Sequence, residues 1–116
     1  MKYKHTTLAL MLAAAGLATT AAHAQQKVVI GFVTDMSSLY SDVEGKGGAT
    51  AIQMAIDDFG GKALGQPIEL LTADHQNKAD IAASKAREWI DTQGATMIFG
   101  GTNSGTAIAT AKVAQE

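Results

Sequence analysis

Three short apolar runs, each followed by a polar segment and then by a helical pattern, constrain the fold most strongly. The runs cover residues 28–33, 67–74 and 95–100. The first run is nearly continuous and rich in β-branched residues, which is typical of a strand buried on both faces of a parallel sheet. Pro67 fits the second run because proline is tolerated at the first position of a strand.

Helical patterns follow all three runs. Apolar residues recur at three-to-four spacing over residues 49–59, and Gly60 and Gly61 end that pattern. Asn77 can cap a second helix, which ends at Gly94. The apolar face of this second helix comprises Ala82, Ala83, Ala86, Trp89 and Ile90, and we expect Trp89 in the core. Strand and helix thus alternate three times, which predicts an α/β fold with an open, Rossmann-like, doubly wound parallel sheet.

The first 24 residues have the layout of a secretory signal peptide. Lys2 and Lys4 give a positive start, residues 8–17 form an apolar run, and a small-x-small cleavage pattern ends at Ala24. The apolar run is shorter than the roughly 20 residues that span a bilayer. We therefore expect export of the chain and a mature protein that begins at Gln25.

The composition excludes several functions. Once the two signal-peptide lysines are removed from the nine basic residues, seven remain against 11 acidic ones. Nucleic acid is therefore not an expected partner, since phosphate binding needs clustered Lys and Arg. The chain has no cysteine, which excludes disulfides, a thiol nucleophile, thiolate metal sites and a lipid attached at the cleavage site. We expect a protein that is not lipid-anchored.

The segment from residue 25 to residue 116 is the length of one small domain or of part of a larger one. The last residues, 106–116, form a helical pattern that no Gly or Asn closes and no strand follows. We therefore expect the sequence to be a piece of a longer protein.

Three loops should meet beyond the carboxyl ends of the strands, where ligands bind in open α/β sheets. They are residues 34–48, 73–78 and 100–106. The third loop is the best candidate, because its glycines let the backbone approach a ligand and the next helix directs free N–H groups toward it. Its polar side chains are Thr102, Asn103, Ser104 and Thr106. The pattern predicts a site for a small anion such as a carboxylate.

The same loop has a simpler interpretation. Asn103 or Ser104 can cap the third helix without contacting a ligand, as Asn and Ser often do. The residues alone do not separate capping from binding, and one loop can do both.

Four stretches in a fixed order carry a resemblance to a known family. They are KVVIGFVTDMSSLYSD, GGATAIQMAIDDFGG, LGQPIELLTADHQNKADIAASKAREWID and MIFGGTNSGTAIATAKVAQE. Together, and behind a signal peptide, they resemble the branched-chain amino acid-binding family of periplasmic solute-binding proteins, which serve ABC importers. The resemblance implies that residues 25–116 are a partial N-terminal lobe of a two-lobed, monomeric periplasmic protein. Such a protein closes on its ligand and delivers it to a membrane permease.

The resemblance also implies ligand-binding residues, because the loops after the first and third strands face the ligand in that family. The matching positions are Tyr40, Thr102, Asn103 and Ser104. Hydroxyl residues of the third loop would hold a carboxylate, and the aromatic residue would pack on the ligand. Two departures leave the ligand open among branched-chain and other amino acids, amides and aromatic acids. Ser38-Leu39 stands where Gly-Pro is common, and Asn103 stands where serine is common.

The remaining polar groups do not indicate catalysis. Asp74 and His75 lack a nucleophile, so we interpret them as organising the loop before the second helix. Asp57 and Asp58 point about 100° apart on a helix and do not converge. Residues 45–48 lack the rest of a phosphate-loop motif and should form the entry to the first helix. We expect no enzyme, no cofactor and no metal site.

Two alternatives to a transporter component stay open. The chain can belong to the sensing domain of a receptor, which would continue into a transmembrane segment. It can also be the N-terminal part of an exported α/β enzyme whose catalytic residues lie beyond Glu116.

Export should remove the signal peptide between Ala24 and Gln25. We expect intact-mass analysis of the protein recovered from the exported fraction to give a mass that begins at Gln25. An exported form that retains Lys2 and Lys4 would contradict this prediction.

Overall fold

The computed structural model describes residues 26–116, so the predicted signal peptide and its cleavage site lie outside the described residues. The elements in chain order are β1 (Val28–Thr34), α1 (Gly45–Asp58), β2 (Lys62–Ala63), β3 (Gln66–Asp74), α2 (Ala79–Gln93), β4 (Ala95–Phe99) and α3 (Ser104–Val113). Within residues 26–116, no helix has the length and apolar character needed to cross a membrane.

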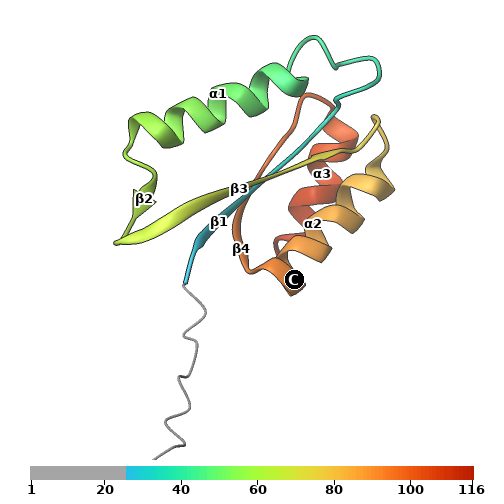
Figure 1. Ribbon diagram of the computed structural model, residues 1–116. Coiled ribbons are helices and arrows are strands. Elements are labelled where there is room, and N and C mark those ends of the chain that lie inside the picture. The colour runs from blue at the N-terminus through green and yellow to red at the C-terminus, as the bar shows by residue number, and fades with distance from the viewer. Residues whose placement is uncertain (1–25) are drawn as a thin grey trace, which may run out of the picture.

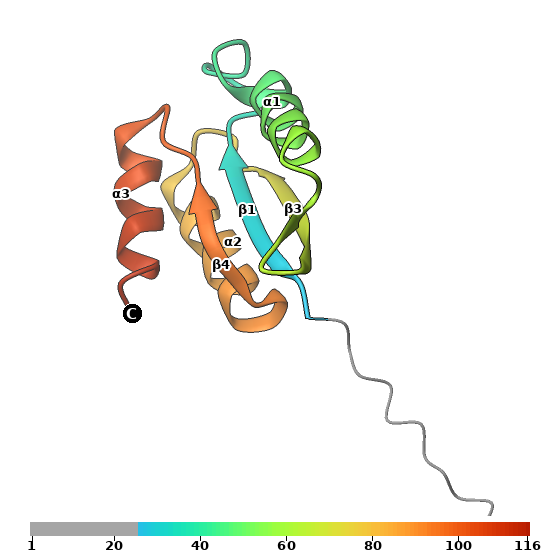
Figure 2. The same cartoon turned by 90° about the vertical axis from the view of Figure 1, so that its left-hand side faces the viewer.

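The strands form one sheet in the order β2-β3-β1-β4. The central strand β1 pairs in parallel with both β3 and β4. Helix α1 lies on one side of the sheet, and α2 and α3 lie side by side on the other (Figures 1 and 2). The predicted α/β fold with a doubly wound parallel sheet is therefore confirmed.

The core lies mainly between the sheet and α2. Val33, Ala82 and Trp89 are buried together, and Ile98 of β4 packs against them. Ala86 is also fully buried, so the predicted apolar face of α2 is the face that meets the sheet. The prediction that Trp89 belongs to the core is confirmed.

Gly31 of β1 allows this packing. A Cβ atom at Gly31 would lie 2.5 Å from Cε3 of Trp89 and 2.8 Å from Cδ1 of Ile98. The indole ring of Trp89 therefore occupies the space that a side chain at position 31 would need.

Three local features differ from the sequence expectations. The short strand β2 was not expected; it pairs antiparallel with β3 through a turn in which Leu64 and Gly65 both have positive φ, as in a type I′ hairpin. Helix α1 begins at Gly45 rather than near residue 49, because the run at 45–48 joins the helix. Asn77 does not cap α2: Lys78 is the N-cap residue and makes no side-chain capping bond.

The close approach at Gly31 makes a prediction about stability. Gly31→Ala should lower the free energy of unfolding by about 1–3 kcal/mol, because the added methyl group overpacks the site against Trp89. Gly47→Ala is the matched control, since nothing lies within 4 Å of a Cβ atom there; in a helix it should be neutral or stabilise by up to about 1 kcal/mol. Urea unfolding of both variants measures the difference, and equal midpoints would contradict the prediction.

Candidate functional site

Three loops meet at the carboxyl ends of β1, β3 and β4, as expected for parallel strands. They comprise residues 35–44, 75–78 and 100–103. Figure 1 shows them at the upper edge of the sheet. Side-chain hydrogen bonds join each loop to the other two, and three carboxylates accept most of them.

Asp35 organises the first loop from inside. Its side chain is fully buried and accepts a 2.6 Å hydrogen bond from Oγ of Ser38. The backbone N–H groups of Ser37, Ser38 and Tyr40 also donate to it, at 3.3, 2.8 and 2.9 Å. Burial raises the pKa of Asp35, but these four donors outweigh it and lower the pKa to about 2. The carboxylate therefore stays charged and keeps the loop folded around it at neutral pH.

Asp74, the last residue of β3, ties the first loop to the second. It accepts hydrogen bonds from the backbone N–H of Met36 at 3.0 Å, from Oγ of Ser37 at 2.5 Å and from the backbone N–H of Gln76 at 2.8 Å. Burial again raises the pKa of this carboxyl, and the three donors lower it below its ordinary value. Asp74 is thus a structural acceptor, which agrees with its expected role in organising this loop.

Glu44, immediately before α1, ties the first loop to the third. One of its oxygens, Oε2, accepts hydrogen bonds from the hydroxyls of Thr34, at 3.0 Å, and of Thr102. The hydroxyl proton of Thr102 is therefore committed to Glu44.

Asn77 and Asn103 tie the second loop to the third. Nδ2 of Asn103 donates to Oδ1 of Asn77 at 2.6 Å. The backbone N–H of Asn77 donates to Nδ1 of His75 at 3.0 Å, which orders this turn and agrees with the expected role of the histidine. Oδ1 of Asn103 accepts from the backbone N–H groups of Gly105 and Thr106. Asn103 is therefore the cap of α3, and Asn77 supports that cap instead of capping α2.

Gly100 brings the third loop against the end of β1. Its φ angle is +143°, and a Cβ atom there would lie 2.1 Å from the carbonyl oxygen of Val33. Only glycine fits this position, so the loop begins at a fixed point on the sheet.

Of the four residues with predicted ligand contacts, Tyr40 lies in the first loop, Thr102 and Asn103 lie in the third, and Ser104 begins α3. Thr102 and Asn103 are half-buried and use the groups just described within the protein. Ser104 is exposed at the first position of α3, and its hydroxyl makes no hydrogen bond with residues 26–116. Tyr40 is half-buried and is held through its backbone, and no hydrogen bond joins its side chain to the third loop within the described part of the chain.

Sequence reasoning missed Asp35 and Glu44. A signal for Asp35 existed, because a carboxylate directly after a buried strand and before Ser37 and Ser38 is typical of an Asx-type turn. No local signal marked Glu44, since its partners are Thr34 and Thr102, 10 and 58 residues away in the chain.

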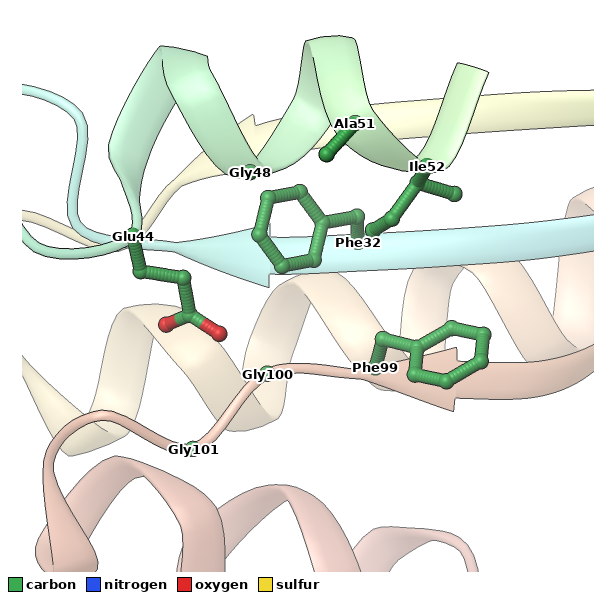
Figure 3. Close-up of a pocket in the computed structure, with 8 residues that line it drawn as sticks. All are labelled: Phe32, Glu44, Gly48, Ala51, Ile52, Phe99, Gly100 and Gly101. Atoms are coloured by element: carbon green, nitrogen blue, oxygen red, sulfur yellow. The ribbon is translucent and has the colours of Figure 1, made fainter. Parts of the chain in front are cut away.

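A hollow of about 490 Å³ opens beside these loops, between α1 and strands β1 and β4. Its lining residues are Phe32, Glu44, Gly48, Ala51, Ile52, Phe99, Gly100 and Gly101. Figure 3 shows Glu44 at one end of the hollow, between the start of α1 and the segment of Gly100 and Gly101. The lining is apolar apart from this carboxylate and the glycine backbone.

Comparison with known proteins places this geometry in a family. The model of the periplasmic binding protein family matches residues 27–116. A periplasmic binding protein from Burkholderia mallei is 62% identical, with a TM-score of 0.74 over 76% of the chain. A branched-chain amino acid ABC transporter periplasmic ligand-binding protein from Burkholderia xenovorans is 53% identical, with a TM-score of 0.73 over 77% of the chain.

A third similar structure is a solute-binding protein of an ABC transporter from Rhodopseudomonas palustris in complex with 3,4-dihydroxybenzoic acid. It is 25% identical, with a TM-score of 0.70 over 76% of the chain. The chain spans 24% of the length of each of these three structures. No curated protein matches the chain.

The cap geometry separates the roles of two neighbouring residues. Asn103→Ala should lower the free energy of unfolding by about 0.5–2 kcal/mol, because it removes the N-cap acceptor of α3. Ser104→Ala should change it by less than about 0.5 kcal/mol, since that hydroxyl is exposed and bonds to none of residues 26–116. Thermal and urea unfolding measure both variants. A larger loss for Ser104→Ala than for Asn103→Ala would contradict the assignment.

Proposed function

The chain belongs to the periplasmic binding protein family, and we propose that it is part of the substrate-binding component of an ABC importer. The protein captures a small carboxylate ligand, such as a branched-chain or other amino acid, an amide or an aromatic acid. It then delivers the ligand to a membrane permease.

The ligand class rests on the relatives and on the third loop. One relative is named for branched-chain amino acids and another holds 3,4-dihydroxybenzoic acid, and these compounds share a carboxylate. In this chain the third loop leads into the amino end of α3, where free backbone N–H groups and the positive end of the helix dipole favour an anion. The observation that carries the proposal is Ser104, whose hydroxyl stands at that helix end and is not used by any described residue.

We assign the ligand contacts unequally among the four candidate residues. Ser104 donates its hydroxyl proton to the carboxylate. Thr102, whose proton is committed to Glu44, contributes its backbone N–H, and Asn103 contributes the second proton of its amide. Tyr40, whose backbone N–H is bonded to Asp35, packs its ring on the apolar part of the ligand.

The cellular setting follows from the same assignment. The relatives are periplasmic and solute-binding proteins, so the protein acts in the periplasm after cleavage of the signal peptide. It works as a monomer that closes on its ligand, and it binds without chemical turnover.

Ser104→Ala tests the proposal in the protein expressed from its complete reading frame. Loss of a hydrogen bond to a charged group costs about 1.5–3 kcal/mol, which corresponds to a roughly ten- to hundredfold weaker affinity. Isothermal titration calorimetry with leucine, phenylalanine and 3,4-dihydroxybenzoate provides the measurement. Ser84→Ala is the matched control, since Ser84 is an exposed helical serine of α2. The ligand affinity of this variant should equal that of the wild type.

Two results would count against the proposed function. Equal affinity of Ser104→Ala and the wild type would remove Ser104 from the site. Consumption of any of these compounds during the titration, detected by chromatography, would favour the enzyme alternative over a binding protein.

A further inference from the structure

Glu44 has an unused acceptor next to the candidate site. Both hydroxyl donors, from Thr34 and Thr102, converge on Oε2. Oε1 accepts no hydrogen bond from residues 26–116, and the side chain is only half-buried. One half of the carboxylate thus fixes the third loop, and the other half is open to a ligand.

The other two carboxylates of the site differ from Glu44 in this respect. Asp35 uses both of its oxygens to accept four hydrogen bonds. Asp74 also uses both oxygens, for three donors. Their acceptor capacity is taken up by the loops that they organise, which leaves Glu44 as the carboxylate of the three with an oxygen to spare.

Glu44 also has no cationic partner in the described part of the chain. The ion pairs there join Lys27 to Glu69, Lys85 to Glu88 and Arg87 to Glu116. Lys78, the lysine in the second loop, hydrogen-bonds to Gln76 instead. A partly buried charge is normally paired, so a positive group on the ligand would complete the surroundings of Glu44.

Glu44 lies between the third loop and the hollow. Its hydrogen bond with Thr102 puts the carboxylate beside the loop to which the ligand's carboxylate is assigned. It is also the charged residue in the lining of the hollow that contains Phe32 and Phe99 (Figure 3). Gly100 and Gly101 belong both to the third loop and to this lining, so Glu44 lies where the third loop adjoins the hollow.

We propose that Glu44 is a specificity-determining residue that selects ligands in which a cationic group accompanies the carboxylate. The inference rests on the proposed function, because it requires a carboxylate to be anchored at the amino end of α3. A negative charge at Glu44 attracts an ammonium group on the ligand and repels a further anionic group. Since the surroundings are partly shielded from water, these interactions are stronger than on an exposed surface. The positive end of α3 and the negative Glu44 therefore form a bipolar site.

Matched ligand pairs and Glu44→Gln test the inference in the protein expressed from its complete reading frame. Leucine is compared with 4-methylpentanoate, and phenylalanine with 3-phenylpropanoate, so that each pair differs by one ammonium group. We expect the wild type to prefer the amino acid of a pair, and Glu44→Gln to reduce that preference about tenfold. The amide oxygen of glutamine still accepts from Thr34 and Thr102, so the loops should stay in place.

Asp58→Asn is the matched control. Asp58 is exposed at the far end of α1, about 20 Å from Glu44 along the helix axis. This substitution also removes one negative charge, but at the opposite end of α1, and the ligand preference of the variant should equal that of the wild type. A second measurement needs no variant: raising the salt concentration should narrow the preference of the wild type, because mobile ions screen the attraction.

The outcomes distinguish this inference from the proposed function. If carboxylates bind but the preference is the same in the wild type and in Glu44→Gln, only the role of Glu44 is wrong. If the wild type binds the pairs but prefers the member without an ammonium group, the role of Glu44 is again wrong and carboxylate capture still stands. If the wild type binds neither member of either pair, nor 3,4-dihydroxybenzoate, carboxylate capture is wrong and the role of Glu44 falls with it. Should Glu44→Gln fail to fold, a preference of the wild type that does not change with salt would overturn the inference.

Discussion

Three carboxylates, of which Asp35 is fully buried, hold the loops at the carboxyl edge of the sheet, and the rest of the candidate site depends on them. Asp35 is fully buried and gathers four donors from its own loop. Asp74 and Glu44 then reach from one loop to another. A charged acceptor forms stronger hydrogen bonds than a neutral one, and leaving it unsatisfied inside a protein is costly. The loops therefore have few alternative conformations that keep all three carboxylates bonded.

This network determines which groups remain for a ligand. Side chains that look equally suitable in the sequence differ once their partners are known: the hydroxyl proton of Thr102 is used by Glu44, and Oδ1 of Asn103 caps α3. Ser104 keeps its hydroxyl. Neighbouring polar residues of one loop thus divide into those that support the site and those that are available to a ligand. Residue type alone does not reveal this division.

The fold could be predicted from the sequence, because the patterns that carry it are local. The β-branched run at 28–33 and the apolar face around Trp89 indicate a buried strand and a helix wherever they occur. The site was only half predictable. The meeting of its three loops follows from topology, but the bond of Glu44 to Thr102 joins residues 58 positions apart. The ligand contacts of Tyr40, Thr102, Asn103 and Ser104 stay predictions. The expected cap at Asn77 was wrong because α2 begins one residue later, with Lys78 as its N-cap residue, and Oδ1 of Asn77 accepts a hydrogen bond from Asn103 instead.

Rigidity of the three loops affects how binding measurements on this protein should be interpreted. A flexible loop must be ordered when a ligand binds, and the free energy of that ordering lowers the affinity. Here the third loop starts at Gly100, which is pressed against Val33, and ends in a helix capped by Asn103. Its middle is bonded to Glu44 through Thr102. Because these contacts are made within the protein, replacing an exposed group such as the Ser104 hydroxyl leaves the loop in place. A change in affinity at that position then reports the lost contact itself, whereas a change at Asn103 combines the contact with the stability of α3.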